Sequence, residues 1–258
     1  MFTSFAYSVY ERHLLRQVKQ RPTPKHVGII LDGNRRHAQQ RKLTQPKEIY
    51  DLGARKLDEV LDWCAELSIP AVTLWVLSTE NLNRPGPEVS GILSAIEAKM
   101  NALACDPEIH RRRVRVRAVG KVDLLPVSLR QSIRAAEAAT ADYGSMLLTI
   151  AVAYGGREEI ADAVRGLLRA GLERGRTLKE IIVDVTPDAI RRHLYIGEIP
   201  DPDLIIRTSG EIRLSGFLLW QSAFSEFYFS DVYWPAFRRI DFLRAIRSFQ
   251  LRRRRFGQ

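Results

Sequence analysis

The chain has 258 residues, of which 45% are hydrophobic and 27% are charged, and its formal net charge is +10 at pH 7. This composition is typical of a globular protein large enough for one α/β domain, and no apolar stretch is long enough to cross a bilayer. The two cysteines, Cys64 and Cys105, exclude a disulfide framework and a CxxC metal site.

Residues 1–24 are predicted to form an N-terminal amphipathic helical segment, followed by one domain over residues 25–258. Within residues 2–18, apolar side chains recur among basic ones. Two placements fit this pattern: a helix packed on its own domain, or a helix lying on a membrane surface. The segment lacks the uninterrupted apolar core of a signal peptide, which predicts a cytoplasmic protein with peripheral membrane contact as an option.

Apolar runs and helical segments alternate along the rest of the chain, which predicts an α/β fold with a largely parallel sheet of about six strands flanked by helices. The predicted strands are residues 26–31, 71–77, 114–119, 147–153, 203–206 and 216–220. The predicted helices are residues 35–42, 48–67, 88–104, 126–142, 157–174, 187–193 and 240–254. No Ser/Gly/Pro-rich linker divides these elements.

The first apolar run stops abruptly at Asp32, which is followed by Gly33, Asn34, Arg35 and Arg36. Gly33 allows the backbone to approach an anion closely, and the start of the next helix and the arginines supply positive charge. At the carboxyl end of a strand, Asp32 could hold Mg²⁺ against a diphosphate. The simpler alternative is an ordinary helix cap.

Ligands in open α/β sheets bind beyond the carboxyl ends of the strands. Several predicted loops there combine small or hydroxyl residues with an arginine, which equips them for more than one phosphate group. They are Ser78-Thr79-Glu80-Asn81 with Arg84, Tyr154-Gly155-Gly156-Arg157, and Arg207 to Glu211 with Arg213 and Ser215. The chain has no nucleotide P-loop, no GxGxxG and no G-x-S-x-G sequence. It also has no zinc finger or RNA-binding aromatic signature, so a basic nucleic-acid-binding module is a weak alternative.

Five strings stand in the order and spacing of the cis-prenyltransferases, the undecaprenyl diphosphate synthase family: HVGIILDGNRR, LSTENLNRP, AYGGREEI, DPDLIIRTSGEIRLSGFLLWQSAFSEFYF and RRFG. The chain resembles this family from about His26 onward, and within it the actinobacterial short-chain Z-prenyl diphosphate synthases. The resemblance implies a fold with an apolar tunnel, Mg²⁺ as cofactor and a homodimer. It also implies that isopentenyl diphosphate is joined to an allylic diphosphate, with geranyl diphosphate giving Z,E-farnesyl diphosphate.

The resemblance also implies roles for individual residues. Asp32 and Asn81 match catalytic positions, and Asp32 and Glu226 match metal-linked carboxylates. Arg255 and Gly257 match a C-terminal motif that in the family reaches toward the partner subunit's site. Substrate-binding positions are matched by Gly33, Asn34, Arg35, Arg36, His37, Ser78, Thr79, Glu80, Arg84, Arg207, Arg213, Leu214 and Ser215.

The chain also departs from the family pattern. Tyr50 stands where many members have histidine, and Ile212 replaces a magnesium-linked histidine. His37 and Leu82 replace tryptophans, and Arg35 replaces a glycine. These departures keep two alternatives open: a branching or cyclising synthase on the same fold, and a non-catalytic partner subunit.

Product length depends on the side chains that line an apolar tunnel. Val76 occupies a position that is small in long-chain members of the family and bulky in short-chain ones. Val76, together with Trp75, is therefore predicted to close the tunnel early and to give a product of farnesyl length.

Overall fold

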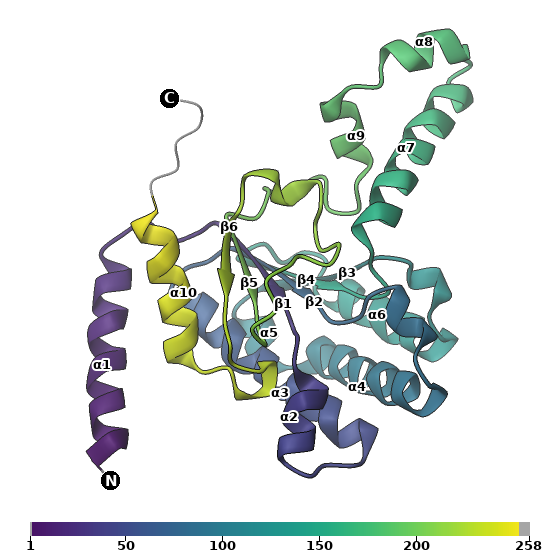
Figure 1. The fold of residues 1–258 in the computed structure, drawn as a ribbon. Coiled ribbons are helices and arrows are strands. Elements are labelled where there is room, and N and C mark those ends of the chain that lie inside the picture. The colour runs from purple at the N-terminus through teal and green to yellow at the C-terminus, as the bar shows by residue number, and fades with distance from the viewer. Residues whose placement is uncertain (1, 253–258) are drawn as a thin grey trace.

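The structure, a computed structural model, describes residues 2–252 and centres on one sheet of six strands (Figure 1). The strands are β1 His26–Ile30, β2 Ala71–Trp75, β3 Val114–Val119, β4 Met146–Ala151, β5 Leu204–Arg207 and β6 Glu226–Phe229. Their order is β3-β4-β2-β1-β5-β6, and every neighbouring pair is parallel. The predicted single α/β domain with a parallel sheet is confirmed.

Helices make the crossover connections from β1 to β5, whereas β5 and β6 are joined by a loop with one short 3-10 turn at Gln221–Phe224. The helices are α1 Phe2–Lys19, α2 Asn34–Gln40, α3 Pro46–Glu66, α4 Gly86–Cys105, α5 Pro107–Arg111, α6 Val127–Ala139, α7 Gly156–Glu173, α8 Leu178–Val183, α9 Pro187–His193 and α10 Arg239–Leu251. The sequence analysis missed α5 and α8, which are too short to show a helical period. Each begins at a side-chain cap, supplied by Asp106 and Thr177 respectively.

One predicted strand, residues 216–220, is wrong. This segment forms turns, and the sixth strand lies further along the chain at Glu226–Phe229. Ser215, Gly216 and Leu218 have positive φ angles of 52°, 98° and 46°, which an extended strand does not allow. The apolar pattern arises because Phe217 and Leu218 are fully buried against the sheet.

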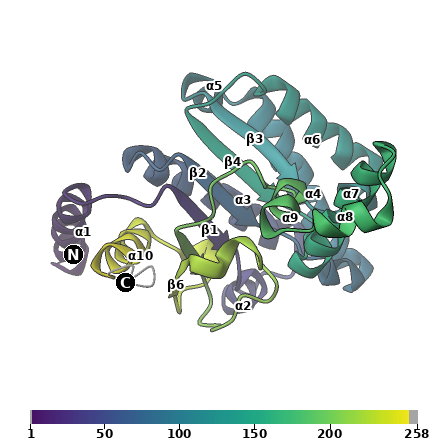
Figure 2. The same ribbon diagram turned by 90° about the horizontal axis from the view of Figure 1, so that it is seen from above.

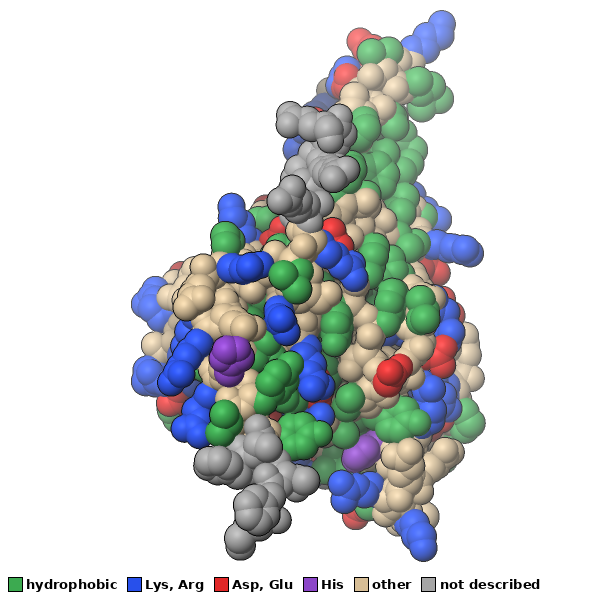
Figure 3. All heavy atoms as spheres, turned by 60° about the vertical axis from the view of Figure 1, so that its left-hand side comes forward, with side chains coloured by type: hydrophobic (Ala, Val, Ile, Leu, Met, Phe, Trp, Pro, Cys, Tyr) green, Lys and Arg blue, Asp and Glu red, His purple; other side chains and the backbone are tan. Residues whose placement is uncertain are grey.

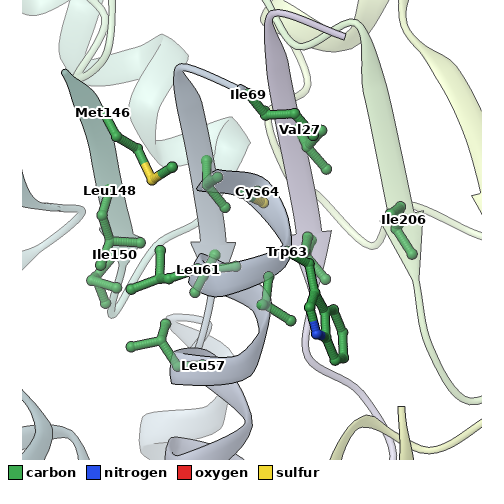
Figure 4. Packing of buried hydrophobic residues seen from close by; sticks show 14 of the residues in the cluster. Val27, Leu57, Leu61, Trp63, Cys64, Ile69, Met146, Leu148, Ile150 and Ile206 are labelled. Atoms are coloured by element: carbon green, nitrogen blue, oxygen red, sulfur yellow. The ribbon is translucent and has the colours of Figure 1, made fainter. Parts of the chain in front are cut away.

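The larger core lies between one face of the sheet and the helices that cover it (Figure 4). From β4, Leu148 and Ile150 lie beside Leu57 and Leu61 of α3, whereas Val27 and Ile206 lie on the side of Cys64 and Trp63. The opposite face carries a smaller core that includes Phe217. This arrangement leaves the carboxyl ends of β1, β2 and β5 as the place where polar loops gather.

Helix α1 lies against α10 at the β6 edge of the sheet (Figure 2). Its Leu14 and Val18 are fully buried in the larger core, so the helix packs on its own domain. Tyr7 and Val9 remain exposed on the same helix. Contact of this outer face with a membrane, and the division of the chain after residue 24, stay predictions. Among residues 2–252, no helix is long and apolar enough to span a bilayer.

Helices α7, α8 and α9 form an arm that projects from the sheet (Figure 1). Five large apolar side chains of this arm are exposed: Leu172, Leu178, Ile182, Val183 and Val185. Figure 3 shows hydrophobic side chains along the same projection. A contiguous exposed apolar surface of this kind is typical of a protein–protein interface.

Candidate active site

A polar cavity of about 770 Å³ lies beyond the carboxyl ends of β1, β2 and β5. Its size falls within the range of small-molecule sites. Most of the predicted site residues line it: Asp32, Gly33, Asn34, Arg35, Arg36, Trp75, Val76, Ser78, Glu80, Asn81, Arg84, Arg207, Arg213 and Ser215. The sheet therefore brings together residues that are as many as 183 positions apart in the chain.

Asp32 stands at the end of β1 with its carboxylate between two arginines. Arg207 donates to its Oδ2 at 2.8 Å, and Arg36 lies 3.4 Å from its Oδ1. Burial raises the pKa of Asp32, but hydrogen bonds from Arg207 and Ser209 outweigh this effect and hold the pKa below its usual value. The carboxylate is therefore ionised at neutral pH. Helix α2 has Gly33 as its N-cap and no side-chain cap, so Asp32 is not a helix cap.

Arg207 connects Asp32 to the loop after β5. Its Nη1 donates to Ser215 Oγ at 2.8 Å and to the carbonyl of Arg213 at 2.5 Å, while the side chain is almost fully buried. Its Nε is buried without a hydrogen-bond partner. A buried guanidinium with an unused donor is a strong site for an oxyanion.

A second group of arginines surrounds the cavity. Arg36 donates to Ser209 Oγ at 2.8 Å and to Glu211 at 3.2 Å, and Glu211 also pairs with Arg213. Among the described residues, five arginines and three acidic residues line the cavity, which gives this lining an excess of two positive charges before a substrate binds. An anionic ligand with several phosphate oxygens would balance this charge.

Ser78 and Asn81 fix each other in the loop after β2. The Ser78 N–H donates to Asn81 Oδ1 at 3.3 Å, and the Asn81 N–H donates to Ser78 Oγ at 3.2 Å. Both side chains face the polar cavity. The amide of Asn81 is therefore held in one orientation toward the space where a substrate would lie.

Glu88 is a site residue that the sequence analysis missed. It accepts hydrogen bonds from Arg84 at 2.9 Å and from the Tyr50 hydroxyl at 3.0 Å, and Arg35 lies 3.6 Å away. Burial and Glu88 together raise the pKa of Tyr50 to about 12, so its hydroxyl stays protonated. The spacing of four residues from Arg84, typical of a helical ion pair, was the available signal.

Gly33 is required at its position. Its φ is 99°, and a Cβ there would lie 2.6 Å from the Tyr233 ring. Arg36 stacks over the same ring at 5.4 Å from its centroid. Tyr233 thus contacts both Gly33 and Arg36. The sequence did not predict Tyr233 as a site residue.

Three predicted substrate-binding residues do not line the polar cavity: His37, Thr79 and Leu214. His37 lies on α2, and Leu214 packs against the smaller core. The Thr79 hydroxyl lies 3.5 Å from the Glu80 carboxylate. Contacts of these three residues with substrate stay predictions, and Arg255 and Gly257 lie outside the described residues.

Glu226, the second predicted metal ligand, lies near the other end of the sheet. It is opposite Leu204 of β5, which in turn is opposite Val27 of β1. Asp32 follows Val27 by five residues, which is about 16 Å along the strand direction. The two carboxylates of one chain therefore do not share a metal ion. A metal role for Glu226 stays a prediction that requires a second chain.

Asp32 fits a magnesium ion. Mg²⁺ is commonly held by one or two carboxylates together with substrate phosphates, and the ionised Asp32 carboxylate faces the cavity. Within the described part of the chain, no group of three His, Cys, Asp or Glu side chains could hold a metal by itself. A diphosphate would have to supply the remaining oxygen ligands.

A smaller apolar cavity of about 70 Å³ adjoins the polar one. Five residues line both cavities: Leu31, Asn34, Tyr50, Val76 and Ile92. A molecule with a charged head and a hydrocarbon tail could therefore place each part in a matching environment. Val76 lies at this junction, and its limit on the length of the tail stays a prediction.

Trp75 lines the polar cavity only. Its ring stacks on Phe217 with centroids 5.4 Å apart, and its Nε1 donates to the carbonyl of Tyr154 at 3.2 Å. Adjacent strand residues point to opposite faces of a sheet, which separates Trp75 from the apolar cavity. The predicted effect of Trp75 on product length is untested, and this geometry gives it less support than Val76.

Glu159 anchors the loop that carries Arg213 and Ser215. This fully buried carboxylate accepts hydrogen bonds from Tyr154 at 2.5 Å, from the Tyr195 N–H at 3.0 Å and from Gln221 at 3.1 Å. Burial raises the pKa of Glu159 above its usual value. Gln221 follows the Arg213 loop directly, so this network fixes the position of the loop.

Comparisons with known proteins agree with this geometry. Residues 30–257 match the family profile described as putative undecaprenyl diphosphate synthase. The chain belongs to this prenyltransferase family. It is 55% identical to an isoprenyl transferase of Deinococcus radiodurans, over 96% of this chain and 91% of that protein.

Two other relatives bear on the activity of this prenyltransferase. It is 51% identical to the (2Z,6E)-farnesyl diphosphate synthase of Thermobifida fusca, over 97% of this chain and 96% of that protein. Its fold matches that of lavandulyl diphosphate synthase from Lavandula x intermedia in complex with dimethylallyl diphosphate. That match has a TM-score of 0.82 and 35% identity, over 92% of this chain and 99% of the other. The protein is thus a prenyltransferase of a family whose members use isopentenyl and allylic diphosphates.

Proposed function

We propose that this cis-prenyltransferase joins isopentenyl diphosphate to a short allylic diphosphate, with geranyl diphosphate preferred, and releases a short Z-prenyl diphosphate such as Z,E-farnesyl diphosphate. The observation that carries the proposal is the size of the apolar cavity, about 70 Å³, next to a polar cavity of about 770 Å³. An apolar cavity of about 150 Å³ takes up one benzene molecule. The hydrocarbon space beside the polar cavity is smaller than this, so a prenyl tail enters only as the lining side chains move apart. Each added isoprene unit requires a larger displacement, which favours a short product.

The chemistry breaks the allylic C–O bond and forms a C–C bond to isopentenyl diphosphate, after which one proton leaves. Negative charge moves onto the departing diphosphate as the C–O bond breaks. Arg36 lies beside Asp32 and binds this charge more tightly in the transition state than in the ground state, which lowers the barrier. A bound Mg²⁺, held by Asp32 and diphosphate oxygens, would add Lewis-acid stabilisation of the same charge.

The second diphosphate is assigned to Arg207, Arg213 and Ser215, which lie together on the other side of Asp32. Asn81 faces the same cavity from the loop after β2. An amide is a poor base, so Asn81 orients a water molecule or the diphosphate that accepts the proton. The orientation is kept by its hydrogen bonds with Ser78.

The proposal includes a homodimer. The exposed apolar side chains of the α7–α9 arm support it, as do Ile212 and Phe224, which are 79% and 77% exposed. A second chain is also needed for Glu226 to act as a metal-linked residue.

A branching or cyclising synthase on the same fold is the alternative function, and its products differ from the linear cis product.

Product analysis tests the function. The purified protein is incubated with Mg²⁺, labelled isopentenyl diphosphate and, in turn, dimethylallyl, geranyl and farnesyl diphosphate. Dephosphorylated products are then compared with cis and trans standards. We expect one short cis product with geranyl diphosphate, and none without Mg²⁺. A long polyprenyl product or a branched product would contradict the proposal.

A further inference from the structure

One charged residue, Lys99, lines the apolar cavity among residues 2–252. Apart from Asn34 and Tyr50, which face both cavities, the rest of the lining is made of small and apolar side chains from the sheet and the ends of its strands, from α3 and α4, and from Trp234. A lysine in such a lining is unusual because an ammonium group is costly to remove from water. Its position therefore requires an explanation.

Lys99 lies at the end of the cavity that is remote from the polar site. Tyr50 of α3 and Ile92 of α4 belong to both cavities and mark the polar end. Along α4 the lining continues from Ile92 to Lys99, which is about 10 Å of helix. Along α3 it continues from Tyr50 to Leu57. Both helices thus lead from the polar site to the lysine.

The ammonium group of Lys99 pairs with Asp58, one residue beyond Leu57 on α3. The Lys99 side chain is 16% exposed and that of Asp58 is 50% exposed. The lysine therefore runs from the cavity wall to the surface. Its methylene groups cover the hydrocarbon space, and its charged end reaches the half-exposed Asp58 carboxylate at the edge of the cavity. The pair also bridges α3 and α4, the two helices that enclose the cavity.

We propose that Lys99, held in place by Asp58, closes the far end of the apolar cavity and limits the length of the prenyl product. This inference rests on the proposed function. A hydrocarbon tail that grows beyond Ile92 and Ile96 meets the lysine stem. Further growth requires the stem to move and the ion pair to break, since the tail cannot share its space with an ammonium group.

Substitution of Lys99 tests the inference. Lys99→Ala removes the stem and opens the end of the cavity. We expect the ratio of longer products to the wild-type product to rise by about tenfold or more, which corresponds to about 1.4 kcal/mol in the relative barriers. Asp58→Asn keeps the stem but removes its anchor, and should raise the same ratio by a smaller factor.

Arg112→Ala is the matched control. Arg112 pairs with Asp62, one turn further along α3, and does not line the cavity. Its product pattern should equal that of the wild type. Asp58 is half exposed, so Asp58→Asn keeps the test valid if Lys99→Ala does not fold. Unchanged product lengths in active Lys99→Ala or Asp58→Asn protein overturn the inference, whereas a wild-type protein that incorporates no isopentenyl diphosphate overturns the proposed function instead.

Discussion

Arg207 and Asp32 form an ion pair of 2.8 Å in which the arginine side chain is only 6% exposed and the aspartate is 29% exposed. The aspartate follows β1 and the arginine ends β5, so the pair joins two neighbouring strands at their carboxyl ends. The same guanidinium also reaches the Arg213 carbonyl and Ser215. The Arg207 side chain thus connects Asp32 at the end of β1 to the loop after β5 that carries Arg213 and Ser215.

Asp32→Asn should reduce kcat by at least about a hundredfold, because it removes the negative charge that would hold Mg²⁺ against the departing diphosphate while keeping the shape of the side chain. The measurement is incorporation of labelled isopentenyl diphosphate at saturating substrate. Asp162→Asn is a suitable control, since Asp162 also pairs with two cations, Lys121 and Arg165, outside the cavity. A kcat for Asp32→Asn within a few fold of the wild type would remove Asp32 from the reaction.

The sequence predicted this part of the site because its signals are local. An apolar run followed by Asp32, Gly33 and arginines identifies a strand end and an anion site without knowledge of the fold. Gly33 has the positive φ and the close neighbour that make glycine necessary. The parallel sheet then brings the separate loops to one edge, which the alternation of strands and helices also predicted.

Other features depend on contacts between distant segments, and the sequence did not reveal them. The apolar run at residues 216–220 packs against the sheet but forms no strand in it. A hydrophobic pattern in the sequence is the same in both cases, so it cannot distinguish them. Tyr233 is near Gly33 only in the folded chain. Lys99 belongs to no recognisable motif, and only its place in the cavity lining and its ion pair with Asp58 of another helix give it a role.

Val76→Ala should lengthen the product, because Val76 lies where the polar and apolar cavities meet. Removing two methyl groups widens the entrance to the hydrocarbon space. Trp75→Phe serves as the comparison: its side chain packs against Phe217, away from the apolar cavity, and we expect unchanged product length. Chromatography of the dephosphorylated products measures both variants. A longer product from Trp75→Phe together with an unchanged product from Val76→Ala would assign chain-length control to Trp75.

Ile182→Glu should weaken self-association. Ile182 is 60% exposed on the α7–α9 arm, and a carboxylate there would be buried at a cost in any dimer that uses this surface. Analytical ultracentrifugation over a range of concentrations measures the dissociation constant. Leu124→Glu, which alters an equally exposed leucine outside the arm, should leave that constant unchanged. Equal dissociation constants for both variants and the wild type would exclude the arm as the interface.

Glu159→Gln should change how stability depends on pH. Burial raises the folded-state pKa of Glu159 above its usual value of 4.5. The folded state therefore holds its proton more tightly than the unfolded state. This contribution to the free energy of unfolding is complete below pH 4.5 and is lost as the pH rises through the folded-state pKa, with a slope of up to about 1.4 kcal/mol per pH unit.

Glutamine has no proton to lose at this position, so the variant lacks this decline. Urea denaturation from pH 4 to pH 8 measures the free energy of unfolding of both proteins. Tyr154 and Gln221 can form hydrogen bonds with either side chain. The free energy of unfolding of the wild type minus that of Glu159→Gln should therefore decrease as the pH rises. Curves that stay parallel over this range would mean that Glu159 has the same pKa in the folded and unfolded states. Its burial would then be offset fully by the three donors that surround it.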